Sequence, residues 1–306
     1  ENLAINSGKV FKMVLMNTPE GEEKNRLFMV GHHLVIDGVS WRILLSDLSR
    51  IVDEVEKGKT LDLGIKGNSY REWGFALQEY VTKKTIASQV GYWSKIHTSY
   101  KALPIDKKTV AKNIYSDVVE YQMILDEENT SLLLQEINQA YGTTINDVLL
   151  GCLGLTISKW SNNEEVIIGL EGHGREEVSE GVDVNTTIGW FTTLYPVCLS
   201  MKKEMSLGDV LTSTKENLRR IPNKGMGFGL LKYMHPSQEI RNRLSAVQWD
   251  IVFNYLGQLD NAIETNSWIT EATESQGNEI GASTPFNNKL EINGGVKNGK
   301  LQLSWS

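Results

Sequence analysis

The sequence is poor in cysteine. Its 306 residues contain two, Cys152 and Cys198, and neither lies in a CxxC or a Cys/His spacing. A disulfide framework and a structural zinc site therefore have little support, and no metal is expected. This cysteine usage predicts a cytoplasmic protein.

Long apolar runs and clusters of positive charge are also missing. No apolar run approaches the roughly 20 residues of a membrane-spanning helix, and the first residues lack a secretory pattern. Thirty-eight acidic residues against 31 basic ones give a net charge of −7, and the basic pairs are scattered along the chain. We expect a soluble protein with neither a membrane nor a nucleic acid as partner.

The pattern that is present predicts an α/β protein. Residues 9–16 and 26–31 form a β-hairpin pattern that leads into His32 and His33. Ser40 is a candidate N-cap for a helix whose apolar residues recur at helical spacing until Gly58.

The later segments alternate between helical and extended patterns. Helices are predicted within 69–98, 126–160 and 206–220, and strands at 117–125, 164–170, 246–258 and around the turn at Asn298-Gly299. Residues 99–116 suggest a linker, so we divide the chain near residue 110 into an N-terminal lobe, 1–110, and a C-terminal lobe, 111–306.

Three of the five histidines, His32, His33 and His173, lie in suggestive places. Histidine is suited to proton transfer near neutral pH, although a histidine beside a turn is more often a hydrogen-bonded structural residue. Side chains alternate along a strand, so His32 and His33 cannot both point into one site, and one should be structural. Adjacent histidines without a third ligand fit no common zinc pattern, and no GxSxG segment supports a serine hydrolase.

The segment LEGHGREE places Glu171, His173, Arg175 and Glu176 after an apolar strand. For an arbitrary segment of this composition, a solvated charged loop is the more frequent explanation. A carboxylate at the end of a buried strand can instead have its pKa raised by desolvation, which makes it a usable proton donor or acceptor. An acid and a histidine from separate lobes could then meet across a cleft.

Aromatic residues in the second half divide into two groups. Trp190, Phe191 and Phe253 are predicted core residues. Asn254 and Tyr255, near the end of an apolar strand, need hydrogen-bonding partners or a cavity.

Taken together, these stretches resemble the epimerization domains of nonribosomal peptide synthetases, within the condensation-domain superfamily. HHLVIDGVSW is similar to the family's HHxxxDGxSW, EGHGRE is the epimerization-type signature, and IGWFTTLYP, PNKGMGFG and FNYLGQ follow in family order. Two features depart from the family: its first signature and a longer segment before the histidines are missing, and Phe228 stands where tyrosine is frequent. We therefore expect a truncated chain with an incomplete first lobe and little activity alone.

The resemblance implies two chloramphenicol-acetyltransferase-like lobes in a V with a tunnel between them. A carrier protein would insert its 4′-phosphopantetheine arm, presenting an L-aminoacyl or L-peptidyl thioester whose Cα is epimerized without a dissociable cofactor. Adenylation and condensation domains of the same synthetase would be further partners.

The resemblance also suggests roles for single residues. His33 and Glu171 would flank the α-carbon, while Asn254, Tyr255 and backbone amides near Gly38 would donate hydrogen bonds to the enolate oxygen. His32 and Asp37 would be structural, with Asp37 paired to Arg175. Two alternatives stay open: a condensation domain that forms the peptide bond, and an inactive docking platform for carrier proteins.

Overall fold

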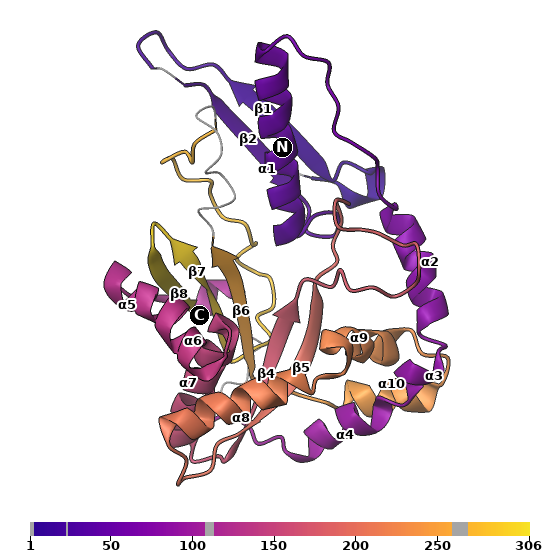
Figure 1. Ribbon diagram of the computed structural model, residues 1–306, viewed down its shortest axis with the longest axis vertical. Helices are drawn as coiled ribbons and strands as arrows, with labels where there is room; N and C mark the ends of the chain where they lie inside the picture. The colour runs from indigo at the N-terminus through magenta and orange to yellow at the C-terminus, as the bar shows by residue number, and fades with distance from the viewer. Residues whose placement is uncertain (1–2, 23, 108–112, 259–268) are drawn as a thin grey trace.

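The computed structural model describes residues 3–22, 24–107, 113–258 and 269–306 and contains two separate β-sheets (Figure 1). The smaller sheet is an antiparallel hairpin of β1 (Phe11–Met16) and β2 (Arg26–Gly31). The larger sheet has the order β3-β8-β7-β6-β4-β5. Its strands are β3 (Tyr121–Ile124), β4 (Glu165–Gly172), β5 (Thr193–Ser200), β6 (Ile251–Gln258), β7 (Leu290–Lys297) and β8 (Lys300–Trp305).

Helices connect and cover these strands. They are α1 (Gly38–Glu56), α2 (Tyr70–Tyr80), α3 (Lys84–Ala87), α4 (Val90–Thr98), α5 (Glu127–Leu132), α6 (Asn138–Tyr141), α7 (Ile145–Ser161), α8 (Leu207–Arg219), α9 (Met226–Tyr233) and α10 (Gln238–Ser245). Figure 1 shows the hairpin and α1 at one end of the molecule and the larger sheet with most helices at the other. In the described part of the chain, no helix has both the length and the apolar character needed to cross a bilayer.

The start of α1 corrects one prediction. Asp37, not Ser40, is the N-cap, because the Asp37 carboxylate accepts a hydrogen bond from the Ser40 amide at 2.7 Å. The helix therefore begins three residues earlier than the serine suggested, directly after the histidine-containing turn.

The main hydrophobic core lies against the larger sheet. Strand β4 is a continuous apolar run that is buried from Val166 to Leu170, as a strand inside a sheet requires. Trp93, Phe228 and Phe253 are almost completely buried in this core. The hairpin of β7 and β8 turns at Asn298 and Gly299, both with positive φ, as the sequence predicted.

The predicted lobe boundary at residue 110 lies outside the described residues. Helices α2 and α4 precede it, yet their residues Trp73, Trp93 and Ile96 belong to the same core cluster as the larger sheet. The division into 1–110 and 111–306 therefore stays a prediction.

Candidate functional site

The two adjacent histidines lie in a turn, because β2 ends at Gly31. The expectation based on strand alternation therefore does not apply to them. His32 closes the turn: its Nδ1 accepts from the Leu34 amide at 3.1 Å, and its carbonyl accepts from the Val35 amide at 2.9 Å. His33 is exposed. The structure thus separates a turn-forming imidazole from an accessible one.

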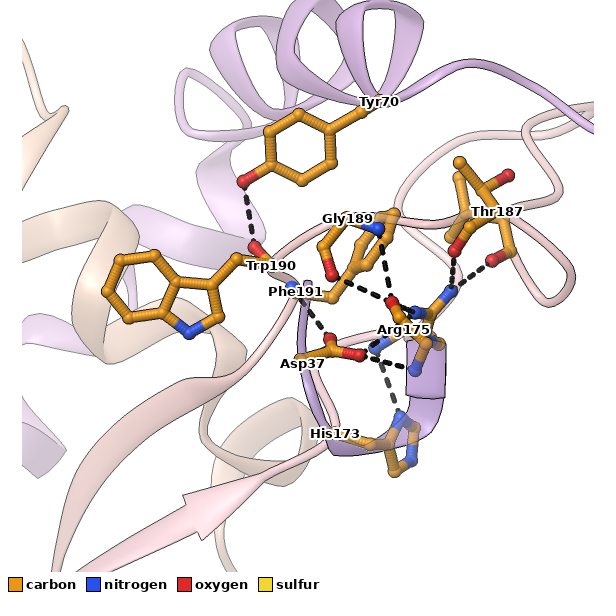
Figure 2. Close-up of polar contacts among 10 residues, drawn as sticks. Asp37, Tyr70, His173, Arg175, Thr187, Gly189, Trp190 and Phe191 are labelled. Atoms are coloured by element: carbon orange, nitrogen blue, oxygen red, sulfur yellow. Dashed lines mark hydrogen bonds and ion pairs between the residues drawn. The ribbon is translucent and has the colours of Figure 1, made fainter. Parts of the chain in front are cut away.

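Asp37 connects this turn to a distant loop (Figure 2). Its side chain is 2% exposed, and its Oδ1 lies 3.3 Å from Arg175 Nη2. Its Oδ2 accepts from the Phe191 amide at 2.9 Å. The carboxylate therefore caps α1 and contacts the chain just after β4 and just before β5. Gly38 follows as the first residue of α1 and is exposed.

Arg175 is the buried cation of this network. Its Nη1 donates to the carbonyls of Val184 at 2.5 Å and Thr187 at 2.8 Å, and its Nη2 donates to Ser40 Oγ at 2.9 Å. The guanidinium lies 4.0 Å from the centre of the Phe191 ring. A buried ion pair with this many hydrogen bonds positions its neighbours, and removal of either partner would leave an uncompensated charge.

Two glycines allow the loops to approach. A Cβ at Gly174, whose φ is +67°, would lie 1.6 Å from the Phe191 carbonyl oxygen. A Cβ at Gly189 would lie 2.5 Å from the Tyr70 ring. Side chains at either position would push the loop before β5 away from Arg175.

Glu171 lies near the end of β4, on the face of the sheet that it shares with Leu194, its partner on β5. Burial raises the pKa of Glu171, the nearby charge of His33 opposes that rise, and Glu291 adds to it. His33 and Glu171, which are 138 positions apart in the sequence, are therefore close enough to interact electrostatically.

The two polar residues near the end of β6 face opposite ways. Leu170 pairs with Phe253, so the next residues, Glu171 and Asn254, share the other face of the sheet. Tyr255 instead packs against the main core and against a smaller cluster formed by Val296, Leu301 and Leu303, and burial raises its pKa. Asn254 is thus on the side of Glu171, and the alternation turns Tyr255 away from it.

The aromatic prediction was correct for two residues and wrong for one. Phe191 and Phe253 are 4% and 1% exposed, whereas Trp190 is 40% exposed. Trp190 belongs to the loop before β5, where alternation does not bury it, and its ring centroid lies 5.3 Å from that of His33.

The remaining histidine of the EGHGRE segment has a local role. His173 Nδ1 accepts from the Arg175 amide at 3.0 Å, and its Nε2 lies 3.1 Å from Glu176, which also pairs with Lys224. This histidine shapes the turn that carries Arg175.

Sequence reasoning missed the roles of Ser40, Tyr70 and Trp190. Ser40 Oγ donates to the Gly189 carbonyl at 2.8 Å, and the Tyr70 hydroxyl donates to the Trp190 carbonyl at 2.7 Å (Figure 2). These bonds join segments over a hundred residues apart, so local patterns carry no signal for them. In the described residues, no group of three or more His, Cys, Asp or Glu side chains could hold a metal ion.

Sequence comparisons with known proteins identify the family of this chain. A family model described as Condensation domain matches residues 1–306. The chain is 37% identical to gramicidin S synthase 1 of Brevibacillus brevis, over 98% of this chain and 28% of that protein. It is 38% identical to tyrocidine synthase 1 of Brevibacillus parabrevis, over 100% of this chain and 28% of that protein. The chain thus spans less than a third of the length of these relatives.

Solved structures of this family have a similar fold. The epimerization domain from the third module of tyrocidine synthetase B matches with a TM-score of 0.86 and 34% identity, over 97% of this chain and 66% of that one. The first condensation domain of the CDA synthetase matches with a TM-score of 0.68 and 14% identity, over 97% and 61%. These likenesses confirm the predicted chloramphenicol-acetyltransferase-like α/β fold.

Proposed function

Because this chain belongs to the Condensation domain family, whose model matches it from end to end, we propose that it epimerizes an aminoacyl or peptidyl thioester. The substrate would be held on the 4′-phosphopantetheine of a carrier protein, next to adenylation and condensation domains of a cytoplasmic peptide synthetase. The likeness to a tyrocidine synthetase epimerization domain supports this choice within the family.

The observation that carries the proposal is that burial raises the pKa of Glu171 while the charge of His33 acts on the same carboxyl group. A carboxyl group whose pKa is raised by burial holds its proton closer to neutral pH than an exposed glutamate does. Histidine is the side chain best suited to proton transfer near neutral pH. Epimerization requires one group that removes a proton from one face of the α-carbon and a second group that delivers a proton to the other face.

The chemistry follows from these two groups. One of them removes the α-proton, and the electron pair of the C–H bond moves into the thioester to give an enolate. The other group delivers a proton to the opposite face, so that a new C–H bond forms with inverted configuration. No other bond of the substrate breaks.

The enolate oxygen needs a hydrogen-bond donor. Asn254 supports this role, since it shares the sheet face of Glu171. A donor role for Tyr255 stays a prediction that its packing against the core does not favour.

The test measures Cα deuterium uptake in D₂O by a carrier-bound aminoacyl thioester. The enzyme in this assay is the natural protein that contains residues 1–306. We expect His33→Ala and Glu171→Gln each to lower the exchange rate about 10²- to 10⁴-fold, the usual contribution of a general acid or base. Exposed residues of the same type serve as controls: His97→Ala and Glu165→Gln, the latter at the other end of β4, should exchange at the parent rate.

The outcomes separate the candidate functions. An inverted stereocentre without a new amide supports epimerization. Dipeptide formation would instead assign the condensation reaction, which the family description also permits. Binding of a loaded carrier protein without exchange would indicate a docking platform, and parent-rate exchange by both site variants would reject the two-residue mechanism.

A further inference from the structure

The loop segment 189–191 is fixed by hydrogen bonds from three side chains of α1, its N-cap and α2, although it lies outside any strand or helix. Ser40 Oγ accepts from the Gly189 amide at 3.1 Å and donates to the Gly189 carbonyl at 2.8 Å. The next carbonyl, that of Trp190, accepts from the Tyr70 hydroxyl at 2.7 Å, and the Phe191 amide donates to Asp37 at 2.9 Å. The main chain on both sides of Trp190 is therefore held in place (Figure 2).

This rigid segment presents a large aromatic side chain that is 40% exposed. Its neighbours Gly189 and Phe191 are tightly packed, the first against the Tyr70 ring and the second under the Arg175 guanidinium. The Phe191 ring is 4% exposed and belongs to the main core. The contribution of the Trp190 ring to the core is small, so core packing does not explain why a large aromatic side chain lies at this position.

The explanation is the contact with His33. The two ring centroids are 5.3 Å apart with an interplanar angle of 47°, a separation typical of interacting aromatic pairs. His33 lies in an exposed turn, and a histidine side chain there would otherwise move between rotamers. The indole restricts that freedom from one side.

Asp37 connects the segment that follows His33 to the loop that carries Trp190. It caps the helix that starts after the His33 turn, and it also accepts from the amide that follows Trp190. A shift of the turn relative to the loop would break hydrogen bonds to one carboxylate. The distance between the two rings is thus set by buried contacts.

We propose that Trp190 is a positioning residue that fixes the orientation of the His33 imidazole, and that Tyr70 and Asp37 hold Trp190 for this task. This inference rests on the proposed function for its catalytic consequence, but the orientation itself belongs to the substrate-free protein. A misplaced base costs rate without loss of binding.

The first experiment needs no turnover. Histidine ring signals are recorded by NMR in the substrate-free protein, and His33 is assigned from the signal lost in His33→Gln. We expect Trp190→Leu to shift and broaden the His33 signals. In Trp190→Phe the His33 signals should shift but stay sharp, because an aromatic ring still restricts the imidazole. Tyr70→Phe should give a change between these two. Trp160→Leu, which removes a 60% exposed indole at the end of α7, is the matched control and should leave His33 unchanged.

The second experiment measures Cα exchange with the same variants. We expect Trp190→Leu to lower kcat about 10- to 100-fold with KM changed less than about threefold, and Trp190→Phe to recover most of the rate. Unchanged His33 signals or an unchanged kcat in Trp190→Leu would overturn the inference. Absence of exchange by the parent protein would instead reject the proposed function, and the NMR comparison would still decide the positioning role.

Discussion

Among single residues of the candidate site, Glu171 is a carboxyl group whose pKa the fold raises. It sits near the end of a strand whose preceding residues are buried, and desolvation is the largest cause of its raised pKa. A folded protein that raises the pKa of a carboxyl group binds that proton more tightly than the unfolded chain does. Its stability therefore falls as the pH rises from the ordinary glutamate pKa through the raised one.

This sign gives a stability prediction for Glu171→Gln. At pH 4 the carboxyl group is largely neutral in both states, so the substitution should change the melting temperature little. At pH 7 the variant avoids the buried charge and should melt about 1–3 °C higher than the parent. Thermal unfolding at the two pH values checks this, with Glu165→Gln at the exposed start of β4 as control. An equal change at both pH values would contradict the assignment of burial as the cause.

Between elements, the turn after β4 approaches the loop before β5 closely at Gly174. Gly174 has a left-handed φ of +67°, and the Phe191 carbonyl occupies the space that a side chain would need. The hydrogen bonds of Arg175, the next residue, depend on that approach. This glycine is therefore required by tertiary contact as well as by backbone conformation.

A matched pair of substitutions separates these two requirements. Gly58 has a similar φ of +64° with no atom within 4 Å of its Cβ position, so Gly58→Ala should cost about 1 kcal/mol from strain alone. Gly174→Ala should cost at least about 3 kcal/mol, because the loop must also move. Urea unfolding of both variants measures the difference. Equal losses would show that the loop adapts freely and that the Arg175 network does not depend on this contact.

In the whole molecule, a buried ion pair and an exposed hydrogen bond join α1 and its N-cap to the larger sheet and its loops. The Asp37 and Arg175 side chains are 2% and 3% exposed, and Arg42 of α1 donates to the Leu256 carbonyl near the end of β6. The ion pair of Arg26 with Glu274 is more exposed, and water screens pairs of that kind, so it contributes little to this placement. The relative placement of the two parts thus depends on the network around Asp37.

The β1–β2 hairpin exposes apolar side chains, and in the described residues its sheet has only these two strands. Those at least 37% exposed are Phe11, Met13, Val14, Leu15, Met16, Leu27 and Phe28. Such a surface and its strand edges favour association. We expect residues 1–306 alone to self-associate.

Sedimentation velocity at about 50 µM tests this expectation, a concentration at which exposed apolar surface drives association. Leu15→Lys combined with Phe28→Lys, on opposite faces of the hairpin, should shift the protein toward monomer. Ile65→Lys is the control, since Ile65 is 99% exposed in a loop. A monomeric parent, or an equal effect of the control, would contradict a hairpin-mediated association.

The sequence by itself determined the elements whose signals are local. The hairpin that leads to the histidines, the buried strand before EGHGRE and the turn at Asn298-Gly299 all agree with the structure. Alternation, helical spacing and turn residues act over a few positions, so they are readable along the chain. The pairing of Asp37 with Arg175 came from the family resemblance, and the structure contains it.

Only the tertiary structure decided how these elements serve one another. Ser40 was predicted as a cap, but it instead bonds a glycine 149 residues away. Trp190 was predicted as core, but its loop places it against His33. Side-chain directions in loops depend on contacts between distant segments, and no short-range periodicity encodes those contacts.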